Sequence, residues 1–225
     1  MFFNPLTSMF MAVLFLILTF FFIMVQIDLV ALVFERLGIP PRFIFTALLF
    51  SLIGSTVNIP LKKIPQEEMA SERSVRVFGF WYVIPPSQKR ETVLAINVGG
   101  AIVPIVISAY LLFKTGLVFK SLLATFFLAA VAHRLARPIK GVGIVLPFFL
   151  SPFTAALLAL IIDPQHAPII AYIAGTLGTL IGADILNLKK VADLGAPVAS
   201  IGGAGTFDGI FLSGILAVIL SAVMV

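Results

Sequence analysis

Apolar stretches long enough to cross a lipid bilayer recur along most of this chain. A helix needs about 20 residues to cross a hydrocarbon core about 30 Å thick, and on that rule the sequence divides into seven candidate segments. They lie at approximately residues 9–34, 43–59, 93–113, 116–134, 142–162, 167–188 and 206–225. Of the 225 residues, 60% are apolar and 11% are charged, which is more apolar surface than a soluble domain of this size can bury. We therefore predict an all-α polytopic membrane protein whose seven transmembrane helices form one domain over residues 1–225.

The distribution of Lys and Arg predicts an orientation for these segments. Short cytoplasmic loops accumulate basic residues, whereas translocated loops do not. With seven spans, 11 of the 15 basic residues fall on one side of the membrane and 4 on the other. The larger group consists of Lys62, Lys63, Arg73, Arg76, Lys89, Arg90, Arg134, Arg137, Lys140, Lys189 and Lys190. We therefore expect a prokaryotic cell-membrane protein with its N-terminus in the cytoplasm and its C-terminus outside.

Residues 61–92 are expected to form a cytoplasmic loop, since this is the one soluble-looking stretch. It contains a β-like run over residues 75–84 that is interrupted by Gly79, and this pattern predicts a short β-hairpin. Trp81 and Tyr82 in that run are interpreted as interfacial anchors at the lipid headgroups. The alternative is a strand that guides a peptide substrate by edge pairing.

Composition also limits the chemistry that the chain can perform. It has no cysteine, which excludes a disulfide scaffold, a thiolate zinc site and a cysteine nucleophile. We expect no metal and no cofactor. The net charge of +5 is explained by helix orientation in a bilayer, so nucleic acid is not an expected partner. Membrane lipids are the expected partners, and the oligomeric state is left open.

Ionisable side chains within a span each cost at least about 2.5–3.5 kcal/mol near its middle, so they indicate function. Most of those in this chain fall at predicted span ends, where water or a neighbouring charge can satisfy them. Asp28, Glu35, Asp163 and His166 are expected at the outer boundary, and His133 at the cytoplasmic boundary. Two further acids, Asp184 and Asp208, do not fit this explanation as easily.

The predicted topology places Asp184 and Asp208 at a similar depth. The sixth span runs inward and the seventh outward, so each acid lies about one turn from a cytoplasmic helix end. Gly175, Gly178 and Gly182 provide a small-residue face on the sixth span, which allows another helix to approach closely. We therefore expect the two acids to lie near one another.

Two carboxyl groups held together where water is scarce cannot both ionise, so they share one proton. The ionised group can then take a proton from an attacking water, while the protonated group donates to a peptide carbonyl oxygen. The glycine-rich run beside Asp208 leaves backbone open to an extended substrate. Asp184 and Asp208 are thus candidate catalytic residues, and the candidate substrate-binding residues are Gly202, Gly203, Gly205, Phe207, Gly209 and Asn187. A structural alternative is that the acids cap helix ends or pair with Lys189 and Lys190.

The segment from Gly205 to Ser213, Gly-Thr-Phe-Asp-Gly-Ile-Phe-Leu-Ser, resembles the second catalytic segment of the GxGD-type intramembrane aspartyl proteases. This is the class of presenilin and signal peptide peptidase, and the resemblance covers the last two predicted spans. It implies hydrolysis of a transmembrane peptide by Asp184 and Asp208. Phe207 stands where that class has a glycine, and Ala183 stands where it often has a tyrosine. As a whole, the chain resembles an uncharacterised prokaryotic family of multi-span membrane proteins.

Ion-coupled transport is an alternative from a different functional class. The run Asn97-Val-Gly-Gly-Ala at the start of the third span is echoed by Ser200-Ile-Gly-Gly-Ala before the seventh. Glycine-broken helix ends of this kind line ion or substrate sites in transporters. Asn97, Asp184, Asn187 and Asp208 would then coordinate Na⁺ or carry a proton. A non-catalytic scaffold that docks partners through residues 61–92 is the third possibility.

Overall fold

The computed structural model describes residues 15, 31–40, 42–65, 73–77, 80–84, 91–139, 143–194, 198–203 and 209–224. The α-helices are α2 (Arg42–Gly54), α3 (Val103–Thr115), α4 (Val118–Leu135), α5 (Leu150–Ile162), α6 (Ala167–Ile173) and α7 (Gly209–Val223). Other helical turns are η1 (Val98–Ile102), η2 (Pro164–His166), η3 (Ala174–Gly178), η4 (Leu180–Asp184) and η5 (Ile185–Leu194). The strands are β1 (Asn58–Pro65), β2 (Arg73–Val77), β3 (Phe80–Ile84), β4 (Glu91–Asn97), β5 (Arg137–Ile139), β6 (Gly143–Val145) and β7 (Val198–Ile201).

Three helical stretches are long and apolar enough to cross a membrane by length and composition. They are Val98–Thr115, Val118–Leu135 and Pro164–Lys190, and two shorter apolar helices cover Leu150–Ile162 and Ile210–Val223. The described part of the chain is thus mostly helical and consistent with a membrane protein, but seven full spans are not shown. Most of the predicted first span, residues 9–34, lies outside the described residues.

Strands occupy the end of the predicted second span and the start of the predicted third span. Helix α2 has 13 residues and ends at Gly54, which gives a length of about 20 Å and leaves it short of a 30 Å core. Strand β1 follows, and β4 takes up residues where the third span was predicted to begin. The two strands pair antiparallel, from Asn58 opposite Asn97 to Pro65 opposite Glu91. Their backbone groups are therefore satisfied by pairing with each other instead of within a helix.

The fifth predicted span, residues 142–162, also begins later in the structure. Residues Gly143–Val145 form β6, which pairs antiparallel with β5, and α5 begins only at Leu150. Pro147 precedes that start, and Pro152 lies in the first turn of α5, where its missing N–H breaks no helical hydrogen bond.

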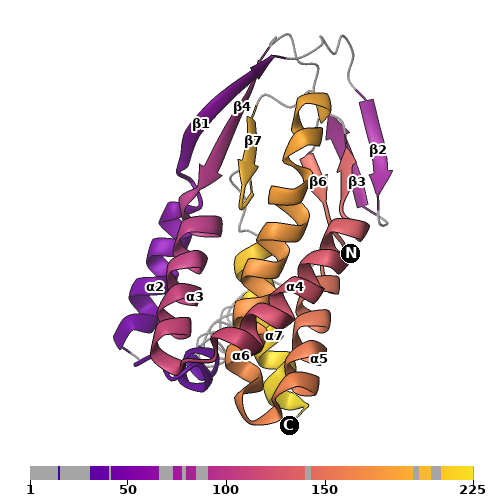
Figure 1. Cartoon of the computed structure of the whole chain (residues 1–225). Coiled ribbons are helices and arrows are strands. Elements are labelled where there is room, and N and C mark those ends of the chain that lie inside the picture. The colour runs from indigo at the N-terminus through magenta and orange to yellow at the C-terminus, as the bar shows by residue number, and fades with distance from the viewer. Residues whose placement is uncertain are drawn as a thin grey trace, which may run out of the picture.

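A three-stranded sheet with the order β1-β4-β7 lies at one end of the helical bundle, called the sheet end below (Figure 1). Strand β7 pairs parallel with β4, with Ala95 opposite Ser200 and Ile96 opposite Ile201. The predicted short hairpin is present as well, since β2 pairs antiparallel with β3. Each of the two parallel strands, β4 and β7, is followed in the chain by a helix that enters the bundle.

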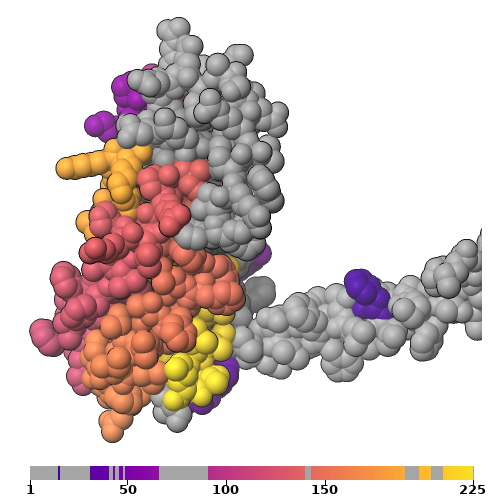
Figure 2. Space-filling model, turned by 90° about the vertical axis from the view of Figure 1, so that its right-hand side faces the viewer, coloured from indigo at the N-terminus to yellow at the C-terminus, as the bar shows by residue number. Residues whose placement is uncertain are grey.

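The buried core lies among the helices. Phe34 and Leu37 pack with Leu111, Tyr172 and Phe211, so the residues before α2 are joined to α3, α6 and α7. A second cluster consists mainly of alanines from α4, α5, α6 and α7. Helices α5 and α7 lie side by side, as Figure 2 shows at the lower end of one face. Small side chains in the core thus allow the helices to pack closely.

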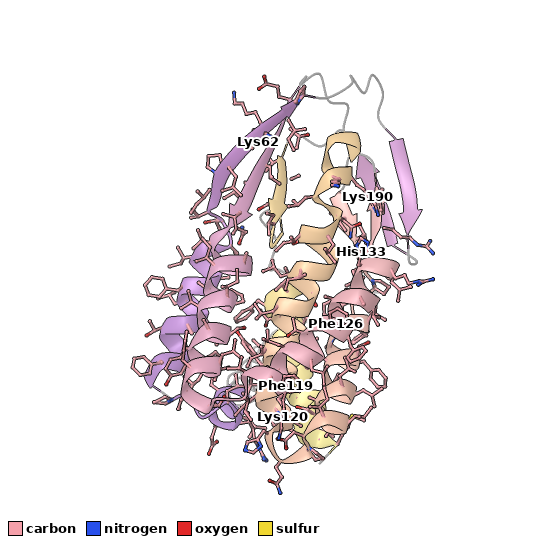
Figure 3. All side chains as sticks on the ribbon, in the orientation of Figure 1. Lys62, Phe119, Lys120, Phe126, His133 and Lys190 are labelled. Carbon is pink, nitrogen blue, oxygen red and sulfur yellow. The ribbon has the colours of Figure 1, made fainter. Side chains whose placement is uncertain are left out.

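Helix α4 packs closely against the helix that carries Asp184. A Cβ atom added at Gly182 would lie 2.8 Å from the Cα of Ala129, so only glycine fits there. Elsewhere on α4, Phe119 is 78% exposed and Phe126 is 68% exposed, and both are labelled in Figure 3. An outward-facing aromatic surface of this kind is suited to contact with lipid.

Candidate functional site

Asp184 lies at the end of a long helix whose hydrogen-bonding pattern changes before it. The α-helical part ends at Ile173, and two π-helical turns follow, η3 and η4, of which Asp184 is the last residue. π-Helical turns are rare in proteins as a whole, and those that occur are often found at functional sites. The half-buried carboxylate of Asp184 accepts the backbone N–H of Gly202 through Oδ2 at 2.8 Å. Two residues predicted to belong to one site, 18 positions apart, are therefore in direct contact.

Gly202 can be nothing but glycine at this position. Its φ is +85°, and Gly203 after it has φ +94°, a region that residues with a side chain rarely adopt. A Cβ atom on Gly202 would also lie 2.6 Å from the Cβ of Ala101 and 2.7 Å from its backbone N. The loop after β7 is thus fixed on one side to η1 and on the other to Asp184.

A buried amide network holds the strands beneath this loop. Ser200 donates its hydroxyl to Asn58 Oδ1 at 2.6 Å. The amide of Asn97 donates to the same oxygen at 3.1 Å and to the carbonyl of Ser55 at 2.7 Å. One side chain on each of β1, β4 and β7 therefore takes part, and the network makes a rigid support for the Gly202 loop.

Asn97 itself also caps the helix that follows it. Its Oδ1 accepts the N–H of Gly100 at 2.8 Å, and the residue is only 1% exposed. Since its carbonyl and both amide hydrogens are engaged by these protein groups, the structure gives Asn97 a structural role and offers no support for ion coordination by it.

Asn187 was predicted to bind substrate on the same helix face as Asp184, but its side chain forms hydrogen bonds within its own helix. Its amide donates to the carbonyls of Gly182 and Ala183 at 3.1 and 2.9 Å. Its Oδ1 accepts from Lys190 Nζ at 2.7 Å. Asn187 therefore closes the end of the helix and positions Lys190.

The remaining predicted site residues lie at the edge of the described chain or beyond it. Gly205, Phe207 and Asp208 are outside the described residues, and Gly209 is the first residue of α7. Ile210 next to it is buried in a small cluster with Ala101 and Leu180. The start of α7 therefore packs on the same helix as Asp184, one turn before that acid.

The family model described as "Protein of unknown function (DUF1614)" matches residues 52–220, well over half of the chain. The chain belongs to this family. No curated protein matches this DUF1614 chain, and no solved structure matches it. The family description assigns no activity, so the resemblance to intramembrane aspartyl proteases stays a prediction.

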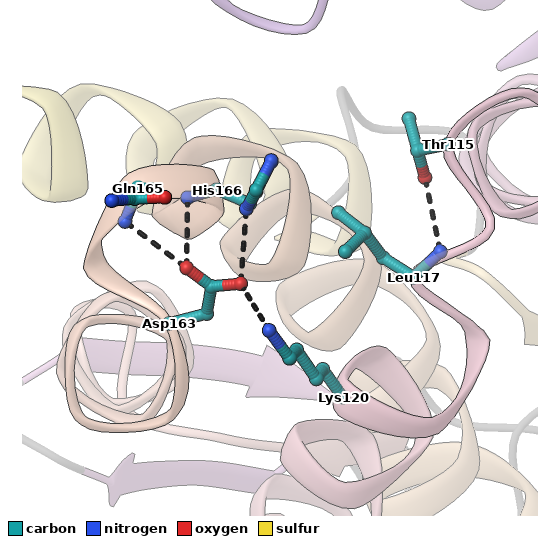
Figure 4. Close-up of polar contacts among 6 residues, drawn as sticks. All are labelled: Thr115, Leu117, Lys120, Asp163, Gln165 and His166. Atoms are coloured by element: carbon teal, nitrogen blue, oxygen red, sulfur yellow. Dashed lines mark hydrogen bonds and ion pairs between the residues drawn. The ribbon is translucent and has the colours of Figure 1, made fainter.

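A second polar cluster lies at the end of this DUF1614 bundle opposite the sheet. Asp163 Oδ2 accepts from Lys120 Nζ at 2.6 Å and contacts His166 Nδ1 at 2.9 Å, while Oδ1 accepts the N–H groups of Gln165 and His166 (Figure 4). The hydrogen bond from Lys120, with the contacts from His166, lowers the pKa of Asp163 to about 2 although burial opposes this. Sequence reasoning located Asp163 and His166 at a span boundary but missed Lys120, which is 43 residues away.

Metal binding is not indicated for the part of the chain that the structure describes. Among those residues, no three His, Asp or Glu side chains come together in a group that could hold an ion. The two carboxylates described above are that of Asp184, with its glycine donor, and that of Asp163, which caps a helical turn.

Proposed function

We propose that this chain is an intramembrane aspartyl hydrolase that cleaves membrane peptides with Asp184 and Asp208. The observation that carries the proposal is the contact between the Asp184 carboxylate and the N–H of Gly202. It joins an acid on an apolar helix to the loop that leads, six residues later, to the second acid. A carboxylate placed in this setting needs a reason, because burying ionisable groups is expensive.

The packing of α7 supports an acid pair. Ile210 follows Asp208 by two residues and packs on Leu180, which precedes Asp184 by four. Among the described residues, the one hydrogen-bond donor to the Asp184 carboxylate is the Gly202 N–H, which binds Oδ2. The other oxygen, Oδ1, therefore remains available for a shared proton. In the proposed reaction, one carboxylate takes a proton from water as the water oxygen bonds to the peptide carbonyl carbon. The protonated partner donates to the carbonyl oxygen, which gives a tetrahedral diol. The proton taken from water then passes to the amide nitrogen as the C–N bond breaks, so the products are an amine and a carboxylic acid, and the acid pair is restored.

The glycines provide the approach for substrate in this proposal. Gly202 is buried against Ala101, but the half-buried Gly203 after it places backbone without a side chain near Asp184, where an extended peptide can come close. Gly205, Phe207 and Gly209 would continue this surface toward Asp208. Asn187 acts indirectly, since its hydrogen bonds fix the helix end behind Asp184.

The full topology belongs to the same proposal, with seven spans and the acid pair near the cytoplasmic face. The separation of charges along the bundle supports it. Lys62 and Lys190 lie toward the sheet end, whereas Lys120 lies at the opposite end (Figure 3). The predicted topology likewise assigns Lys62 and Lys190 to the cytoplasmic side and Lys120 to the outer side.

The test is cleavage of a membrane-spanning peptide by the purified chain in liposomes. We expect cleavage by the wild type and at least a 100-fold loss in both Asp184→Asn and Asp208→Asn. The double variant should be no worse than either single variant, because groups that act as a unit are not additive. Asn matches Asp in size, so unchanged thermal stability would assign the loss to ionisation. Full cleavage by either single variant would refute the pair.

Phe207→Gly provides a matched variant for the same assay. It replaces the ring beside Asp208 by the glycine of the GxGD class, so we expect activity equal to or higher than that of the wild type. Loss of cleavage with retained folding would show that the resemblance does not extend to the reaction.

Proton- or Na⁺-coupled transport is the second candidate, favoured by the π-helical turns η3 and η4 within one span. Ion sites in transporters are lined by helices whose regular hydrogen bonding is interrupted. In that case Na⁺ or a pH change would raise the apparent melting temperature of the wild type, and Asp184→Asn would abolish the increase. No peptide would be cleaved.

A further inference from the structure

Four basic residues belong to the elements in which two membrane-length helices end. Arg134 is in the last turn of α4, and Arg137 follows in β5. Lys189 and Lys190 belong to η5, which lies against β5. All four are exposed. Because Val118–Leu135 and Pro164–Lys190 are apolar enough to span a membrane, the cluster lies at the level where the apolar surface ends.

Two basic residues at the opposite end of the bundle are held by other groups of the chain. Lys114 donates to the backbone carbonyl of Gly38, and Lys120 binds the carboxylate of Asp163. At the sheet end, Lys190 is positioned by Asn187. Neither Arg134 nor Lys189 has an ion-pair partner within the described part of the chain. The charges of Arg134 and Lys189 are therefore available to a ligand at this end.

Exposed apolar side chains adjoin the same four residues. Leu135 is 44% exposed beside Arg134, and Ile185 and Leu186 are 43% and 51% exposed one turn before Lys189. Basic groups above an apolar surface match a molecule with an anionic head and a hydrocarbon tail. A phospholipid has this chemistry, since its phosphate accepts from Arg and Lys while its acyl chains lie along Leu and Ile.

We propose that Arg134, Arg137, Lys189 and Lys190, with Leu135, Ile185 and Leu186, form a binding site for a phospholipid with an anionic headgroup. The site lies at the ends of α4 and η5 and does not depend on the proposed hydrolase activity. A bound lipid would join the end of α4 to the helix that carries Asp184. Anionic lipid would therefore stabilise the part of the fold that supports Asp184.

The experiment measures thermal unfolding of the full chain in neutral detergent with added phosphatidylglycerol, phosphatidylcholine or inorganic phosphate. We expect phosphatidylglycerol to raise the apparent Tm by several degrees and the other two to have little effect. In Arg134→Gln/Lys189→Gln, at least tenfold more phosphatidylglycerol should be needed for the same rise. The single variant Lys189→Gln, on an exposed position, should show part of this change.

The matched control is Lys62→Gln/Lys63→Gln, which removes the same charge at the sheet end but on β1. Lys63 pairs with Glu91 at 3.3 Å on the exposed strand surface, and a pair of that kind contributes little to stability. The control should respond to phosphatidylglycerol like the wild type. Equal stabilisation by phosphatidylcholine, equal stabilisation by phosphate, or equal loss of response in both double variants would each overturn the proposal.

Discussion

Asp163 is a carboxylate whose hydrogen-bonding capacity is used almost completely by the residues around it. It receives two backbone N–H groups from the turn that it caps, the ammonium of Lys120 and a contact from the His166 ring. Hydrogen bonds to a charged group are each worth about 1.5–3 kcal/mol. The cluster therefore joins α4 to the connection between α5 and α6.

This cluster predicts a stability that depends on pH. The pKa of Asp163 is lowered from 3.8 to about 2, first by Lys120, so its ionised form is favoured in the folded state. Its contribution is present above about pH 4 and is lost as the pH falls through about 2. We expect Asp163→Asn to lower the apparent Tm by several degrees at pH 7, with a smaller difference from the wild type at pH 3.

Glu35→Gln is the control, because Glu35 is an exposed carboxylate. Its Tm should follow the wild type at both pH values. A Tm difference for Asp163→Asn that is the same at pH 7 and pH 3 would mean that its charge does not contribute.

The β4-η1-α3 junction is where an apolar stretch changes from strand to helix. Hydropathy could not reveal this change, since residues 93–96 are all apolar and lead towards the helix, and the partner strand β1 ends at Pro65, well before β4 begins at Glu91. The β2–β3 hairpin was predictable because a glycine interrupted a local β-like run. The contact of Asp184 with Gly202 and that of Lys120 with Asp163 both join distant elements, so periodicity and spacing could not specify them.

Asn97 is predicted to stabilise this junction. Asn97→Leu removes an N-cap, worth about 0.5–2 kcal/mol, and takes the amide donor from the Ser55 carbonyl, which costs about 1–3 kcal/mol. We expect a loss of about 2–4 kcal/mol in a reversible unfolding measurement. Asn97→Ser keeps a capping oxygen but cannot reach Ser55 or Asn58, so its loss should be intermediate. Equal stability of all three proteins would contradict the network.

At the scale of the whole molecule, the seven-span proposal predicts opposite locations for the two ends of the bundle. The chain has no cysteine, so each introduced cysteine is the sole target for a thiol reagent. Cysteines at Lys63 and Lys190 should react only from the cytoplasmic side, and one at Gln165 only from outside. A C-terminal reporter active in the cytoplasm would rule out an odd number of spans.

The identity of the helical elements was largely predictable from apolar length, and the family match agrees with the expectation of a family of unknown function. The number of full spans was not predictable in this way, because α2, α5 and α7 have 13 to 15 residues and a full span needs about 20. Of the candidate site, the contact of Asp184 with Gly202 is described, whereas Asp208 lies outside the described residues.

Because β4 pairs in parallel with β7, the three-stranded sheet can be completed only after β7 has been synthesised. Val93 in β4 pairs with Val198 in β7. Strand β4 therefore stays without this neighbour until roughly 100 further residues have been synthesised, and α3 to α6 are synthesised and inserted during that time. Pairings between distant segments form slowly because the loop between them must first be closed. The donor to Asp184 is in the turn after β7, so Asp184 stays without it until Gly202 has been synthesised. A nascent or wrongly inserted chain would therefore lack the arrangement on which activity is proposed to depend.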